Sequence, residues 1–131
     1  MATTPSFTST PRMESINVAT ANLRDPAGTI ATLIQGVAAG TKVQEIAAKL
    51  NINGASTASS CLIFISTDSG STWRLFDEMV LAAATGSASV ASTRNTLTYN
   101  NLVLVGTAHR LGAASTVSQS TTVVCMAGDL T

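Results

Sequence analysis

Charged side chains are scarce in this chain of 131 residues: only 11% are Asp, Glu, Lys or Arg, whereas 45% are hydrophobic. Typical soluble domains are about 25% charged. Ser, Thr, Asn and Gln fill most of the remaining polar positions. Because so few charges protect a surface poorly against association, we expect much of it to be buried against other subunits. A monomer with an apolar surface is the alternative.

The chain also lacks a basic cluster and a long apolar run. Its seven Lys and Arg residues are scattered and are balanced by seven Asp and Glu residues. Nucleic-acid binding needs clustered cations, so we expect no direct nucleic-acid partner. The longest strictly apolar run, residues 79–84, is too short to span a bilayer, and the N-terminus does not resemble a secretion signal. We therefore expect no membrane partner and synthesis in the cytosol.

Cysteine and histidine are too few for most reactive sites. Cys61 and Cys125 are too far apart in sequence for a paired-cysteine metal site, and both lie in apolar, β-like runs. We expect buried, reduced thiols, and a disulfide between them only if their strands are neighbours. His109 is the single histidine and so the only residue that could serve as the base of a nucleophile–His–acid triad. Its alternating surroundings instead indicate an exposed or interface position on a strand.

Acidic pairs and glycine patterns do not supply a catalytic site either. Asp77 and Glu78 are adjacent on an expected strand, so their side chains should point to opposite faces and not act together as a glycosidase pair. The glycines form no phosphate-binding fingerprint. One carboxylate, Asp68, lies near Gly70, which is too few for calcium. We therefore predict no enzymatic activity, no catalytic residue, no cofactor and no metal.

Short β-like runs separated by turn residues recur along the chain. They cover residues 15–22, 29–35, 42–52, 60–66, 72–82, 97–105, 107–112 and 116–126, with a weak strand or loop over 86–92. The run over 42–52 also fits a helix face, but its position between Gly40 and Gly54 favours a strand. About seven to nine short strands without a convincing helix predict an all-β fold, a single jelly-roll-like β-sandwich over residues 15–131.

The first fourteen residues differ from the rest because Thr, Ser and Pro dominate them. Each proline fixes φ and removes a hydrogen-bond donor, which favours an extended, solvated chain. We expect an N-terminal arm over residues 1–14 that could be deleted without harm to the fold. It is either a disordered tail or a segment that docks on a partner through Phe7, Pro11 and Arg12.

The most distinctive local motif lies between the runs over 60–66 and 72–82. It consists of Ser66, Asp68, Gly70, Thr72 and Trp73, and it resembles the Asp box (Ser-x-Asp-x-Gly-x-Thr-Trp) of sialidases and other β-propellers. In that family the motif is repeated, stabilises a hairpin turn and lies away from the active site. This chain has one copy and is too short for a propeller. The resemblance therefore implies a hairpin with Trp73 packed under its turn, and not sialidase activity.

Three features along the chain point to a wider resemblance. They are the sequence Thr-Pro-Arg-Met-Glu before a β-like run, the hairpin over 62–80, and an apolar final strand that closes in Gly-Asp-Leu. Together, residues 10–131 resemble the head cement or decoration proteins of tailed bacteriophages. The resemblance implies a jelly-roll-like domain made in the host cytoplasm that forms homo-oligomers, dimers or trimers. In the virion it would bind the outside of the capsid and cement neighbouring copies of the major capsid protein.

Two alternatives stay open. A tail, neck or coat component of the virion would share the same β-rich composition. A carbohydrate-binding β-sandwich module would need exposed aromatic side chains, but only 4% of the residues are aromatic. Of these, we expect Phe64 in the core and Trp73 beside the turn, which leaves little for a sugar-binding surface.

Overall fold

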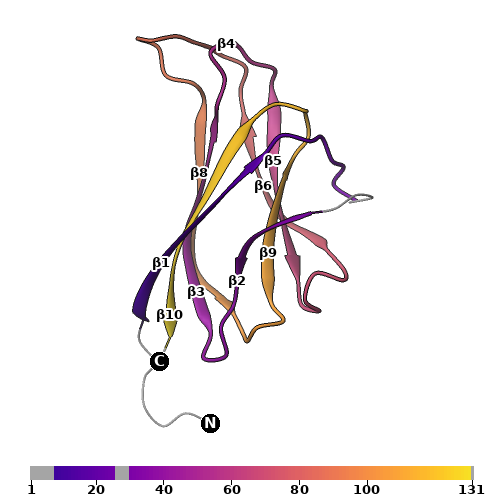
Figure 1. Cartoon of the computed structure of the whole chain (residues 1–131), viewed down its shortest axis with the longest axis vertical. Coiled ribbons are helices and arrows are strands. Elements are labelled where there is room, and N and C mark those ends of the chain that lie inside the picture. The colour runs from indigo at the N-terminus through magenta and orange to yellow at the C-terminus, as the bar shows by residue number, and fades with distance from the viewer. Residues whose placement is uncertain (1–7, 26–29, 131) are drawn as a thin grey trace.

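The computed structural model describes residues 8–25 and 30–130, and within these ranges the chain forms strands, turns and irregular connections without a helix (Figure 1). The all-β prediction is therefore confirmed. The strands are β1 (Thr8–Val18), β2 (Ala31–Gln35), β3 (Thr41–Leu50), β4 (Gly54–Ala55), β5 (Ser59–Ser66), β6 (Arg74–Leu81), β7 (Thr85–Gly86), β8 (Arg94–Leu104), β9 (Arg110–Ser115) and β10 (Thr121–Leu130).

Eight of these strands form two four-stranded antiparallel sheets. The first sheet has the order β1-β10-β3-β8 and the second has the order β2-β9-β5-β6. The short strands β4 and β7 pair separately at one end of the molecule (Figure 1). Apart from the β5–β6 hairpin, each step along these eight strands takes the chain from one sheet to the other. Apart from that hairpin, neighbouring strands of each sheet are therefore distant in the sequence.

The main hydrophobic core lies between the two sheets. It joins Ile46 and Val123 of the first sheet to Ile63 and Leu111 of the second, all of them fully buried. Successive side chains of a strand point to opposite faces, so alternate residues of each strand fill this core. Burial of a side chain of this size stabilises the fold by about 1.5–3 kcal/mol.

A second hydrophobic cluster lies on the outer face of the β2-β9-β5-β6 sheet. Its members are Ile30, Leu62, Phe64 and Ala114, with Trp73 packed against them. The chain between β1 and β2 reaches this face, where Arg24 Nε lies 2.7 Å from Glu78 Oε2 on β6. Phe64 is thus buried as expected, but in this outer cluster and not between the sheets.

The structure also decides the strand that was ambiguous in sequence. The run over 42–52 is a strand and not a helix, as predicted, and this strand, β3, covers Thr41–Leu50. β8 runs through the Tyr99-Asn100-Asn101 interruption as a β-bulge, since Val43 pairs with Leu102 while Glu45 pairs with Thr98. Additional residues in one strand of a pair are accommodated in this way without ending it.

Two predicted strands begin several residues too early. The strand expected over 107–112 begins only at Arg110, because residues 107–109 belong to the connection that precedes β9. The strand expected over 116–126 begins at Thr121 and continues to Leu130. In both cases polar and small residues alternate in the connection as they would in a strand. The local pattern therefore could not distinguish the connection from the strand that follows it.

Residues 8–14, which composition assigned to the arm, form part of the first sheet. They belong to β1 and pair with residues 125–130 of β10. Pro11 is compatible with this strand because β1 lies at the edge of the sheet, where a missing donor can face solvent. Phe7 lies outside the described residues.

Candidate functional site

The turn between β5 and β6 is held by side chains of the Asp-box-like motif. Ser66 Oγ donates to Asp68 Oδ1 at 2.8 Å and accepts the N–H of Gly70 at 2.8 Å. Asp68 Oδ1 also accepts the N–H of Thr72 at 2.8 Å. The hydrogen bond from Thr72, followed by that from Ser66, lowers the pKa of Asp68 below its ordinary value. Gly70 has a φ of 87°, which glycine adopts without strain.

Trp73 packs against this turn and over Gly112 of β9. A Cβ on Gly70 would lie 3.5 Å from the Trp73 ring, and a Cβ on Gly112 would lie 3.0 Å from it. The same Cβ on Gly112 would meet Ile30 Cγ2 at 2.6 Å and the Ala31 carbonyl oxygen at 2.9 Å. Only glycine at position 112 therefore lets Trp73 and the start of β2 approach β9 this closely.

We expect Gly112→Ala to destabilise the protein by about 1–3 kcal/mol, because the added methyl group overpacks this contact. Trp73 should move toward solvent, so urea unfolding followed by tryptophan fluorescence should show a lower midpoint and a red-shifted native emission. Gly54→Ala is the control, because its Cβ would meet nothing within 4 Å. It strains the backbone, whose φ is 101°, but should leave the Trp73 emission unchanged. An unchanged midpoint and emission for Gly112→Ala would contradict the packing described above.

Arg12 joins four strands at one edge of the molecule. Its Nη1 donates to the Gln35 carbonyl oxygen at 2.9 Å and to Asp129 Oδ1 at 3.2 Å, and its Nη2 donates to Glu14 Oε1 at 3.0 Å. Thr41 Oγ1 donates to the same Asp129 oxygen at 2.9 Å. Burial alone would lower the pKa of Arg12, but the bonds to Glu14 and Asp129 outweigh it and raise the pKa. The side chain expected to contact a partner is thus occupied within its own chain.

The three residues expected in the docking arm do not form one described surface. Phe7 lies outside the described residues. Pro11 is exposed on β1, whereas the side chain of its neighbour Arg12 is only 20% exposed. Residues that are adjacent on a strand point to opposite faces, so Pro11 and Arg12 cannot contact one flat partner together.

The titratable residues considered for catalysis have separate structural partners. His109 precedes β9, and its Nδ1 accepts the N–H of Val105 at 3.2 Å. Asp77 accepts the hydroxyl of Tyr99 at 2.8 Å, while Glu78 pairs with Arg24, so the two carboxylates face opposite sides as predicted. Within residues 8–25 and 30–130, no group of three His, Cys, Asp or Glu residues could hold a metal ion.

The cysteines lie on different sheets, Cys61 on β5 and Cys125 on β10. Both are free and fully buried, as predicted. Burial away from water disfavours the thiolate and raises the pKa of each thiol to about 12. Neither is therefore a nucleophile in the folded protein near neutral pH.

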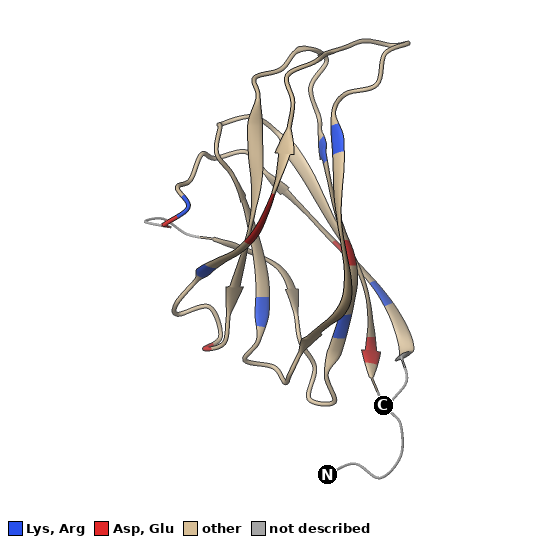
Figure 2. Cartoon of the chain, turned by 180° about the vertical axis from the view of Figure 1, so that it is seen from behind, with Lys and Arg blue, Asp and Glu red and all other residues tan. Residues whose placement is uncertain are grey.

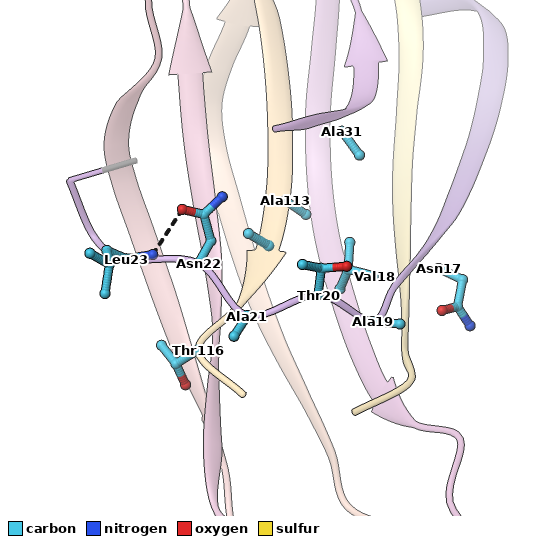
Figure 3. A pocket seen from close by; sticks show the side chains of 11 residues that line it. Asn17, Val18, Ala19, Thr20, Ala21, Asn22, Leu23, Ala31, Ala113 and Thr116 are labelled. Atoms are coloured by element: carbon cyan, nitrogen blue, oxygen red, sulfur yellow. Dashed lines mark hydrogen bonds between the residues drawn. The ribbon is translucent and has the colours of Figure 1, made fainter. Parts of the chain in front are cut away.

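A groove of about 680 Å³ lies beside the segment that follows β1 (Figure 3). It is lined by Asn17, Val18, Ala19, Thr20, Ala21, Asn22, Leu23, Ala31, Ala113, Ala114 and Thr116. These described lining residues include no charged and no aromatic side chain, so they offer neither an acid or base nor a stacking surface for a sugar. No sequence motif indicated this groove, because alanine and threonine have no distinctive chemistry.

The arrangement of charges agrees with the scatter seen in the sequence. Figure 2 shows Lys and Arg interspersed with Asp and Glu over the strands. No helix of the described chain is long and apolar enough to cross a membrane. Comparison with known proteins assigns no family, since no protein-family model matches the chain and no curated protein matches its sequence.

Proposed function

We propose that this chain is a structural virion protein with a jelly-roll fold, which binds the outside of a phage capsid and cements neighbouring copies of the major capsid protein. The observation that supports it best is the strand order, β1-β10-β3-β8 facing β2-β9-β5-β6. The chain passes from one sheet to the other at every step along these eight strands except the β5–β6 hairpin. This order is typical of a jelly roll, an arrangement that recurs in viral capsid domains. Since a fold alone does not define a function, the surface must also suit the role.

The surface suits repeated contacts because large apolar side chains are exposed between few charges. Met13 on β1 is 70% exposed, Val80 on β6 is 64% exposed and Val105 after β8 is 65% exposed. Met13 is paired with Met126 of β10 on the outer face of the first sheet. Burial of such side chains against a neighbouring subunit contributes favourable free energy to association.

Cementing requires many identical contacts made by a rigid module, and no chemical step. A standard interface buries about 1,600 Å² in total, and repetition around a shell adds avidity to each modest contact. The two packed sheets provide the rigidity, and their outer faces provide the area.

The test is the number of copies in the particle that contains this protein. We expect quantitative mass spectrometry of purified particles to give a copy number comparable to that of the major capsid protein. Protein added to shells that lack it should bind saturably to their outer surface. A few copies per particle would favour the tail or neck alternative, and a copy number of zero would overturn the virion proposal.

A carbohydrate-binding module is the second candidate, and one contact favours it. Phe76 is 40% exposed, and its ring lies 5.7 Å from that of Tyr99 on β8. Exposed aromatic rings can stack on sugars. A glycan array without a hit for the unaltered chain would exclude this function, whereas a hit lost in Phe76→Ala would favour it over cementing.

A further inference from the structure

β1 is an 11-residue edge strand whose register is unbroken from Thr10 to Val18, whereas the edge strand β8, also of 11 residues, contains a bulge. Four strands end the two sheets, namely β1 and β8 in the first and β2 and β6 in the second. β6 and β8 lie against each other, since Asn95 Nδ2 donates to the Val80 carbonyl oxygen at 3.0 Å. The hydroxyl of Tyr99 on β8 also donates to Asp77 on β6. β1 also approaches β2, since Arg12 Nη1 donates to the Gln35 carbonyl oxygen at 2.9 Å, but β2 has only 5 residues against the 11 of β1.

An uncovered edge strand presents unpaired backbone groups to another strand. Along β1 the side chains alternate between the inner and the outer face of the first sheet. Arg12 and Glu14 pair with Ala127 and Cys125 on the inner face. Met13 lies between them on the outer face and is 70% exposed.

We propose that two copies of this chain associate through antiparallel pairing of their β1 strands, around a twofold axis at Met13. Such an axis is perpendicular to the sheet and keeps the inner faces of both copies on the same side. It places Met13 opposite Met13 of the second copy. Because β1 extends from Thr8 to Val18, Thr8 then lies opposite Val18 of the second copy. Pro11, opposite Ser15, is the one position of β1 that brings no backbone donor to this pairing.

The charges on β1 select this register. Arg12 keeps its bonds to Gln35 and Asp129 within its own chain, and with the axis at Met13 its positive charge lies directly opposite Glu14 of the second copy, while Glu14 lies opposite Arg12. An axis at Arg12 would instead oppose two arginines, and an axis at Glu14 would oppose two carboxylates. Opposite charges across an antiparallel pair are stabilising, whereas like charges are destabilising.

Pairing in this register converts two four-stranded sheets into one continuous eight-stranded sheet. The two Met13 side chains meet on its outer face, each beside its own Met126, which accounts for an exposed methionine at the centre of an edge strand. This pairing is the contact through which copies of the chain associate in the proposed function, and it rests on that association and not on capsid binding. It can be tested without a capsid.

The first test is cross-linking of the full-length Met13→Cys variant. Cys61 and Cys125 are fully buried, so the new thiol is the only accessible one in the fold. Residues directly opposite in an antiparallel pair have Cα atoms about 4.5–5.5 Å apart, which a disulfide can bridge. We therefore expect mild oxidation to convert Met13→Cys into a covalent dimer, and sedimentation equilibrium of the unaltered chain to give the mass of a dimer.

Ser15→Cys is the matched control, since Ser15 is exposed on the same face of the same strand. In the proposed register it lies opposite Pro11 of the second copy, and the two Ser15 Cα atoms are on the order of 13 Å apart. Its disulfide yield should be at least about tenfold lower, because a bridge cannot span that distance. Equal yields, or a monomeric unaltered chain at every concentration, would overturn the pairing. A cross-linked dimer that does not bind shells would instead refute the cementing function alone.

Discussion

Removing residues 1–14 is expected to lower the free energy of unfolding by at least about 3 kcal/mol relative to removing residues 1–7 alone. Residues 8–14 pair with residues 125–130 of β10, so the longer truncation takes away most of one side of that strand. It also removes Arg12. Asp129 and Thr41, which bond to Arg12, would then lose a charged partner in a site where the Asp129 side chain is only 20% exposed.

Urea unfolding of the two truncated proteins, followed by Trp73 fluorescence, measures this difference directly. The shorter truncation is the matched control because it leaves the whole of β1 in place. Equal unfolding midpoints would show that β1 contributes little to the domain and would contradict its pairing with β10. The expectation also revises the one drawn from composition, in which residues 1–14 could be removed without harm to the fold.

Raising the pH from 9 to 12 is expected to destabilise the protein by several kcal/mol through its two buried thiols. Burial raises the pKa of Cys61 and of Cys125 from 9.0 to about 12, so the folded state keeps both protons over a range in which the unfolded state loses them. Their stabilising contribution is therefore complete below pH 9 and is lost as the pH rises toward 12. A shift of this size corresponds to about 4 kcal/mol for each thiol.

Equilibrium unfolding in urea at a series of pH values between 8 and 11.5 measures this dependence. The double variant Cys61→Ala/Cys125→Ala is the control, and its free energy of unfolding should fall less steeply with pH. Some alkaline dependence should remain, because burial followed by the hydrogen bond to Asp77 raises the pKa of Tyr99. Identical slopes for the variant and the unaltered chain would show that the thiols are not buried as described.

The β5–β6 hairpin was predictable from sequence because its chemistry is local. Ser66 and Asp68 satisfy backbone groups within four residues of themselves, and Gly70 takes the conformation that the turn requires. Alternation within β5 likewise indicated which residues are buried. It did not indicate that Phe64 lies in a cluster outside the two sheets, because that depends on Ile30 and on the approach of the distant segment before β2.

The start of β9 shows where local pattern fails. Residues 107–111 alternate as a strand would, yet the connection continues through His109, whose carbonyl oxygen accepts the N–H of Gly36 at 2.9 Å and whose Nδ1 accepts that of Val105. Both contacts follow from how the β8–β9 connection meets the end of β2. No short-range rule distinguishes such a connection from a strand.

Arg12 is the clearest case in which tertiary structure decides the role of a residue. In the sequence it follows a proline in a segment without an obvious partner, which suggested a docking contact. In the fold its guanidinium bonds to Asp129, 117 residues away, and to Gln35 on the other sheet. The exposed neighbour, Met13, is the side chain left free for a second copy.

Composition and short-range pattern were enough to predict that the protein is all-β and that residues 66–73 form a turn, and they show that charged residues, histidine and cysteine are few. Those properties depend on composition and on interactions between residues close together in the chain. The pairing of distant strands was needed to establish which strands lie at the sheet edges, what Arg12 binds, and that Phe64 is buried on the outer face of the β2-β9-β5-β6 sheet. These depend on pairing between distant strands, whose register is determined by how both sheets pack around a shared core.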